Sequence, residues 1–214
     1  MRMQFRDFIA SDFSFHEEPV LVLEGFWTRE ELAYFQDAMK SSSWTPLSKL
    51  SNMEQFSKDC GNWLQGEFKN EQDRGVFCKR IDLPFIVDYV NSFPNIKKGY
   101  LGFKYYAYGA GDCLTLHDDT DGYSNQQHPV RRRLAITTYL HSEWKHNWGG
   151  ELILYETHKD ETGKQVFQVS HCIPPESGSL VIFTVPRLHR VCRIDPLAGN
   201  HKRLSISGWL STEH

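Results

Sequence analysis

Apolar and polar residues follow two different patterns along the chain, and the change between them comes near residue 100. Residues 20–23 form a short apolar run that is typical of a buried strand. Shortly after this run, apolar residues recur at the spacing of one helix face: Leu32, Phe35 and Met39. Thr28, followed three residues later by Glu31, completes a capping box, which predicts that a helix begins there.

Two more segments lie before residue 100. The sequence PFIVDYVNSF at 84–93 predicts a second helix, which Pro94 ends. Residues 41–75 are polar and rich in Ser, Asn and Gly, with aromatic residues interspersed. We expect this stretch to be a long covering segment with some helix, and we consider it a candidate for part of a lid over a substrate.

After residue 100 the segments are short, rich in β-branched and aromatic residues, and bounded by turn residues, as strands are. They cover 101–108, 113–117, 133–140, 151–155, 165–169, 179–184, 189–194 and 203–210. Two helices followed by this series of strands predict an α+β, mainly β fold: a double-stranded β-helix (jelly-roll) core with N-terminal supporting helices. The 214 residues suit a single domain. We expect a supporting and covering part at 1–99 and the core at 100–211.

The composition bears on partners and location. The formal net charge of -3 gives no reason to expect nucleic-acid binding through bulk electrostatics. No stretch approaches the ~20 apolar residues of a membrane span, and the first residues lack the continuous apolar region of a signal peptide. The five cysteines are scattered and form no CxxC pair, so we expect free thiols in a reducing cytoplasm. We expect a monomer or a homodimer.

His117 and Asp119, together with the distant His189, are the first candidates for chemistry. Alternate residues of a strand point to the same side, so His117 and Asp119 can reach one metal if the chain stays extended there. Two imidazoles and one carboxylate form the facial triad that binds non-haem Fe(II) and leaves coordination positions open. The alternative is an ordinary surface turn, DDTDG, beside a hydrogen-bonded histidine.

Arg203 suggests what fills two of those open positions. Alternation places four residues on one face of this strand: Arg203, Ser205, Ser207 and Trp209. A polar face in an interior strand is unusual for packing but natural for the wall of a pocket. Arginine offers a rigid, charged fork to a carboxylate, and a neighbouring hydroxyl can share it, so an organic diacid would fit. The alternative for Arg203 is a surface salt bridge.

Five segments of the second half form a pattern in order. They are Tyr108-x-x-Gly111 with His117-x-Asp119, the strand from Arg133 to Leu140, the string Trp148-Gly149-Gly150 with Tyr155, the string His189-Arg190-Val191, and the strand from Arg203 to Trp209. In this order they resemble the prolyl 4-hydroxylase-like 2-oxoglutarate/Fe(II) dioxygenases over about residues 100–211. The last segment is especially close to the branch that hydroxylates a proline of a ribosomal protein.

The resemblance assigns roles to individual residues. It implies that Fe(II) is bound by His117, Asp119 and His189. It implies a site for 2-oxoglutarate made by Arg203, Tyr108, Tyr139, Ser205 and Thr137. Two further residues are candidate substrate contacts: Arg131, for which solvated strand entry is the alternative, and Trp209, which we expect to pack beneath the site. The 14-residue step from His189 to Arg203 is longer than in many members but leaves the strand alternation intact.

The resemblance also implies a reaction. It is the hydroxylation of an unactivated C–H bond with O2, releasing succinate and CO2, with ascorbate as a reductant. The substrate would be a prolyl or other residue of a protein or peptide, a free amino acid or a small metabolite, and the loops at 120–130 and 144–148 are placed to contact it. Related halogenases replace the carboxylate at Asp119 with a small residue, so its presence favours hydroxylation. The alternatives are a non-catalytic jelly-roll binding or interaction module, and a cupin-like zinc or iron enzyme that uses no 2-oxoglutarate.

Overall fold

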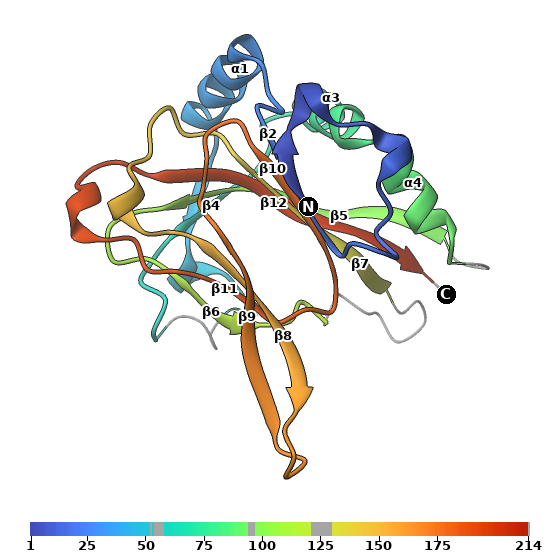
Figure 1. The fold of residues 1–214 in the computed structure, drawn as a ribbon. Helices are drawn as coiled ribbons and strands as arrows, with labels where there is room; N and C mark the ends of the chain where they lie inside the picture. The colour runs from blue at the N-terminus through green and yellow to red at the C-terminus, as the bar shows by residue number, and fades with distance from the viewer. Residues whose placement is uncertain (52, 54–57, 94–96, 121–129, 214) are drawn as a thin grey trace.

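Two sheets form the body of the protein in the computed structural model, which describes residues 1–51, 53, 58–93, 97–120 and 130–213 (Figure 1). The larger sheet contains, in spatial order, β1 (Arg2–Gln4), β2 (Val20–Glu24), β10 (Leu180–Thr184), β7 (Val130–Tyr139), β12 (Arg203–Glu213), β5 (Lys97–Tyr108), β4 (Leu64–Gly66) and β3 (Trp44–Pro46). The smaller sheet contains β6 (Leu114–His117), β11 (His189–Val191), β8 (Leu152–Lys159) and β9 (Gln165–Ile173). The predicted jelly-roll core is confirmed.

In the part of the chain that the structure describes, the larger sheet is supported by the helices α1 (Arg29–Lys40), α3 (Glu71–Ile81) and α4 (Pro84–Asn91). Figure 1 shows them on the side of this sheet that faces away from the smaller sheet. The capping box of α1 is present, because the Thr28 hydroxyl accepts from the Glu31 amide and the Glu31 carboxylate accepts from the Thr28 amide. The predicted second helix corresponds to α4, whereas Pro94 lies outside the described residues.

Strand alternation divides the core between the two faces of the larger sheet. On β7, Leu134 and Ile136 join the cluster under the helices, which also contains Phe35 and Phe77. Residues of the opposite parity on β7 point the other way: Ala135 and Tyr139 pack in the cluster that contains Leu152 and Leu154 of the smaller sheet. The same two-sided burial explains why β10, LVIFT, reads as a nearly continuous apolar run. The polar side chains of β12 also point into this space between the two sheets.

The prediction of some helix within 41–75 is confirmed, because α3 begins before the segment ends. The prediction missed two short strands, β3 and β4, which pair with each other and extend the larger sheet beside β5. Strands of three residues are too short to show an alternating pattern, which is why the sequence did not reveal them. Residues 52 and 54–57 lie outside the described part, and a lid role for this segment stays a prediction.

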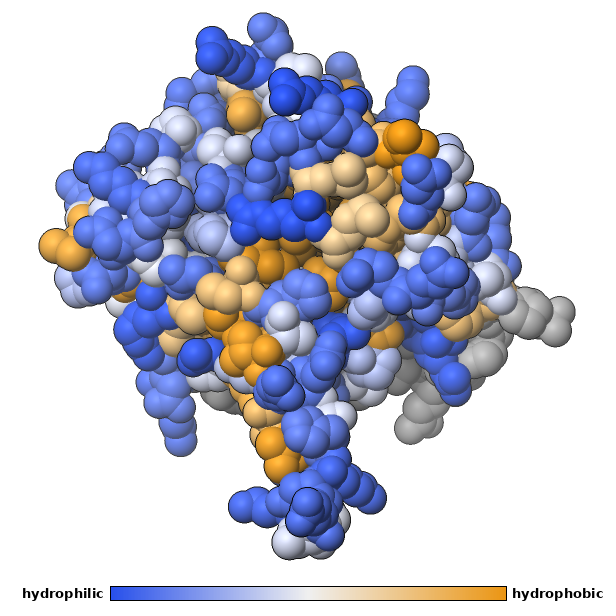
Figure 2. All heavy atoms as spheres, in the orientation of Figure 1, coloured by the Kyte–Doolittle hydropathy of each residue, from blue (hydrophilic) through white to orange (hydrophobic). Residues whose placement is uncertain are grey.

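The strands β8 and β9 form a hairpin that projects from the body of the molecule (Figure 1). Apolar atoms are visible along it in the space-filling view (Figure 2), and Phe167 and Val169 of β9 are its large exposed apolar side chains. All five cysteines have free thiols. Among the described residues, no helix has the length and apolar character needed to cross a bilayer. The division of the chain into one domain stays a prediction.

Candidate metal centre

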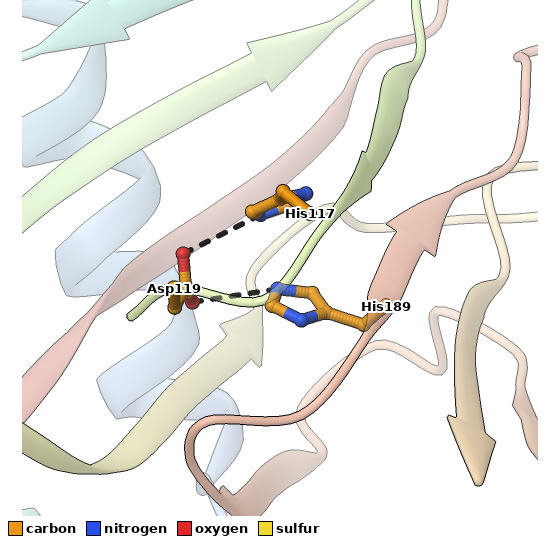
Figure 3. A group of neighbouring side chains, drawn as sticks. All are labelled: His117, Asp119 and His189. Atoms are coloured by element: carbon orange, nitrogen blue, oxygen red, sulfur yellow. Dashed lines mark ion pairs between the residues drawn. The ribbon is translucent and has the colours of Figure 1, made fainter. Parts of the chain in front are cut away.

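His117 and His189 face each other across neighbouring strands. The last residue of β6, His117, is paired with the first residue of β11, His189, and their ring centroids lie 4.1 Å apart. Asp119 completes the group: its Oδ1 is 3.4 Å from Nε2 of His117 and its Oδ2 is 3.4 Å from Nε2 of His189 (Figure 3). One ligand atom from each residue lies within 4.8 Å of the others. The three side chains could therefore hold one metal ion.

The backbone fixes which imidazole nitrogen is available. Nδ1 of His117 donates to the carbonyl of Thr115 at 2.8 Å, and Nδ1 of His189 donates to the carbonyl of Arg187 at 2.7 Å. A carbonyl can only accept, so Nδ1 carries a proton in both rings, and Nε2 is the nitrogen whose lone pair becomes available when the imidazole is neutral. Both Nε2 atoms face Asp119. In metal sites, a carbonyl that accepts from the other ring nitrogen in this way fixes the orientation of a histidine ligand.

Asp119 reaches this position by a different route from the one that strand alternation predicts. The strand β6 ends at His117, and Asp119 has a φ of 60°, in the left-handed region. Aspartate tolerates this region better than most residues with a side chain, and strained conformations of this kind cluster at functional sites. The condition of an extended chain from His117 to Asp119 is therefore not met, although both side chains reach the same point.

Electrostatics favour the protonation states that bind a cation. Burial, together with repulsion from His189, lowers the pKa of His117 to about 4. Burial of Asp119 would raise its pKa, but the hydrogen bond and charge of His189, with contributions from His117 and Trp209, lower the pKa to about 2. At neutral pH the group therefore presents a neutral imidazole at His117 and a carboxylate at Asp119. Metal ligands must be in these deprotonated forms.

Arg203 is a buried cation that has no acidic partner within the described residues. Its side chain is almost fully buried; Nε donates to the carbonyl of Gly150 at 2.9 Å and Nη2 donates to the Tyr139 hydroxyl at 3.2 Å. Its guanidinium lies over the rings of Tyr139 (4.7 Å) and Tyr108 (5.5 Å). Among the described residues, no carboxylate forms an ion pair with Arg203, and the buried Ser205 hydroxyl has no hydrogen-bond partner. Buried charges are normally paired, so this pocket fits an anion.

The metal-binding group and Arg203 open into the same cavity, whose volume is about 460 Å³. This volume lies in the range of small-molecule sites. Its walls include the candidate residues His117, Asp119, His189, Arg203, Tyr108, Thr137, Ser205 and Trp209. Tyr139 is fully buried and is not a wall residue, so its hydroxyl acts on the cavity only through Arg203. The hydroxyl groups of Thr137 and Ser207 form a hydrogen bond, with 2.7 Å between the two oxygens.

The candidate substrate contact on β7 moves by one residue. Arg131 is exposed and is not among the wall residues, whereas Arg132 lines the cavity. The reason is a bulge: Leu134 pairs with Leu210 of β12, but the next pair joins Arg132 to Ser211. The extra residue reverses the alternation, so Arg132, rather than Arg131, lies on the cavity side of β7 with Ala135 and Thr137.

Other expectations for the cavity have mixed outcomes. Trp209 does line it, and its Nε1 donates to Oδ2 of Asp119 at 2.8 Å. The loop at 144–148 does not, because Trp144 and Trp148 pack outside the cavity. Residues 121–129 of the second candidate loop lie outside the described part of the chain.

Trp63 is a cavity residue that the sequence did not identify. It lines the cavity and stacks on Tyr108, with 5.3 Å between the ring centroids. The only signal in the sequence was an aromatic residue in a polar segment.

Gly150 is required for the position of Arg203. An added Cβ would lie 2.6 Å from Cδ1 of Ile194 and 3.0 Å from Cδ of Arg203, at a φ of 79°. Gly163, in the turn of the projecting hairpin, has a similar φ of 80° but nothing within 4 Å of an added Cβ. Alanine at Gly163 should cost about 1 kcal/mol of unfolding free energy through its backbone. Alanine at Gly150 should lower the free energy of unfolding by about 1–3 kcal/mol more than alanine at Gly163 does, because its Cβ also overpacks the site.

Urea unfolding of the two alanine variants checks this expectation. Equal losses of unfolding free energy would contradict the close packing that we describe around Arg203.

Known proteins share this architecture. The oxidoreductase of the 2OG-Fe(II) oxygenase family from Burkholderia pseudomallei matches with a TM-score of 0.64 at 13% identity, covering 99% of this chain and 95% of that one. A Pseudomonas putida prolyl-4-hydroxylase matches with a TM-score of 0.60 at 15% identity, covering 94% and 96%. At these identities the likeness shows the fold alone.

Sequence comparison goes further. The prolyl 3-hydroxylase OGFOD1 of Mus musculus is 35% identical over 101 residues, which cover 46% of this chain and only 16% of that protein. The sequence profile of the 2OG-Fe(II) oxygenase superfamily matches residues 103–211. This range is half of the chain and contains the metal-binding group and Arg203. The chain belongs to the 2OG-Fe(II) oxygenase superfamily and resembles its prolyl hydroxylases.

Proposed function

We propose that the chain is an Fe(II)- and 2-oxoglutarate-dependent dioxygenase that hydroxylates an unactivated C–H bond. One observation carries the proposal: the group that could hold a metal and an uncompensated buried arginine line a single cavity. The superfamily supplies the identity of the metal and of the cosubstrate. The side chains present fit both.

Fe(II) would be held by Nε2 of His117, Nε2 of His189 and the Asp119 carboxylate. This donor set suits non-haem iron and leaves positions open for a cosubstrate and O2. When bound, iron and 2-oxoglutarate supply the oxidising chemistry, in which 2-oxoglutarate and O2 are converted to succinate, CO2 and the oxygen that is transferred to substrate. The chain contributes by fixing the ligands, because each histidine is oriented by a backbone carbonyl.

The far carboxylate of 2-oxoglutarate would bind Arg203, with the unpartnered Ser205 hydroxyl as a second donor. The hydrogen bonds from Arg203 to the Gly150 carbonyl and the Tyr139 hydroxyl hold the guanidinium in place before the anion arrives. Such preorganisation lowers the entropic cost of binding. Tyr108 and Thr137 complete the walls beside the bound diacid.

The substrate that we propose is an amino-acid residue of a protein or peptide, with proline as the first choice. The support is that OGFOD1 is named a prolyl 3-hydroxylase and the Pseudomonas putida structure a prolyl-4-hydroxylase. A free amino acid or a small metabolite is the second choice, since about 460 Å³ also suits a small molecule. Ascorbate would keep the iron reduced.

Purified protein supplied with Fe(II), 2-oxoglutarate, ascorbate and O2 tests the proposal. We expect succinate to form, and to form faster when prolyl peptides or a cell lysate is added, with a +16 Da product in the mass spectrum. Stable binding of redox-inert Zn(II) without O2 consumption, in the presence of every substrate class, would instead favour the non-catalytic binding module.

A further inference from the structure

Trp209 is held in a fixed place beside the metal-binding group. The Arg132 guanidinium lies 3.6 Å from the centre of its ring. Gly102 provides space for the ring, because a Cβ at this position would lie 3.2 Å from Cζ3 of the indole. Gly102 also has a φ of 64°, in the region that favours glycine. The indole is therefore confined by contacts from β7 and β5, and its Nε1 donates to Oδ2 of Asp119 at 2.8 Å.

Asp119 needs such a contact because β6 does not hold it. The strand ends at His117, and Asp119 lies beyond it in a left-handed conformation. The two carboxylate oxygens are equivalent in chemistry, and each lies 3.4 Å from one imidazole nitrogen. The Trp209 indole makes them different, since it can only donate and it donates to Oδ2. Oδ1 faces Nε2 of His117 and, at 3.7 Å, Nη1 of Arg132.

We infer that Trp209 is a positioning residue for the Asp119 ligand: its N–H holds Oδ2 and thereby orients the carboxylate toward the metal. The inference rests on the proposed function, in which Asp119 binds Fe(II). A hydrogen bond from a neutral donor to a carboxylate is stronger than one between two neutral groups, so it can select one carboxylate rotamer. Outer-shell partners of metal ligands typically change metal affinity or activity by 10–100-fold. Arg132 secures the ring that makes this contact.

This role differs from a contact with substrate, which is the role that the sequence suggested for Trp209. A substrate contact would affect binding of the substrate and leave the metal unchanged. A positioning role affects the metal before any substrate is present. The two roles can therefore be separated by measuring metal binding alone, without turnover.

The experiment measures binding of Co(II), an O2-stable probe for Fe(II), by its visible absorption in the otherwise metal-free protein. Trp209→Phe keeps an aromatic ring and removes the N–H. We expect the dissociation constant for Co(II) to rise about 10-fold and the absorption bands to shift. The matched control is Trp44→Phe, which also loses one indole hydrogen bond, to the Met39 carbonyl at 3.1 Å, but lies outside the cavity. It should bind Co(II) as the unaltered protein does.

Two further variants make every outcome decisive. Benzothienylalanine at position 209 keeps the two-ring shape and replaces the N–H with sulfur, so it tests the role even if Trp209→Phe does not fold. Unchanged affinity and absorption bands in this variant would overturn the inference. His189→Ala tests the proposed function separately: if the unaltered protein and His189→Ala bind Co(II) equally, the metal centre itself is misassigned, whatever Trp209 does.

Discussion

Asp119→Asn should abolish turnover while leaving the fold intact. Asparagine tolerates the left-handed backbone at this position and can still accept the Trp209 N–H through its amide oxygen. What is lost is the negative charge that faces two imidazoles. Losing a direct ligand should exceed the effect of losing an outer-shell partner, so we expect affinity for Fe(II) or Co(II) to fall by at least about 100-fold. Succinate formation should fall at least as much.

The measurement combines metal content after dialysis, Co(II) titration and succinate formation under saturating 2-oxoglutarate. Asp160→Asn is the matched control, because Asp160 also accepts hydrogen bonds from its neighbours but lies in the turn of the projecting hairpin. Thermal unfolding of both variants should match that of the metal-free unaltered protein within the range typical of surface substitutions. A fully active Asp119→Asn variant would remove this carboxylate from the metal centre.

The two histidines and Asp119 could be predicted because their residue types, order and spacing carry the information. His117 and His189 are far apart in the sequence, but they lie side by side because β6 and β11 pair as neighbours in the jelly-roll. The backbone at Asp119 could not be predicted, since a φ of 60° has no signature in an aspartate. Asp119 was therefore placed beside the two histidines without its backbone conformation being foreseen.

Bulges limit what strand parity can predict. From Arg203 to Ser207 the alternation of β12 is regular, and all three residues predicted for the cavity face line it. On β7 the pairing shifts between Leu134 and Arg132, so parity counted from the apolar run fails at the basic end. One inserted residue moves every side chain beyond it to the other face. Neither the identity of the bulged residue nor its neighbours reveal this shift.

Contacts between distant segments were the least predictable part of the site. The hydrogen bond from Trp209 to Asp119 joins residues 90 positions apart, and Trp63 reaches the cavity from the position just before β4, a strand of three residues that no periodicity marks. Such contacts depend on the final packing of both sheets. The sequence predicts which residues can take part, and the packing decides which of them meet.

Arg203→Met should remove binding of 2-oxoglutarate with little loss of stability. Methionine fills a similar space, and it removes the desolvation cost of a buried charge that has no acidic partner in the described part of the chain. Removing one partner of a buried, hydrogen-bonded charge pair costs about 2–5 kcal/mol in binding, so the dissociation constant for 2-oxoglutarate should rise by about 30-fold at the least. Arg203→Lys keeps the charge but loses the planar fork and should lie between the two.

Calorimetric titration of the anaerobic Mn(II)-loaded protein with 2-oxoglutarate gives the dissociation constants, and succinate formation gives turnover. Arg193→Met is the matched control, because Arg193 also donates to backbone carbonyls, those of Gly111 and Asp59, but from outside the cavity. Loss of affinity in Arg203→Met with normal metal binding would separate the cosubstrate site from the metal site. Unchanged turnover in Arg203→Met would mean that the oxidation does not use 2-oxoglutarate. The protein would then act like a cupin-like enzyme, in which no bound anion depends on the charge of Arg203.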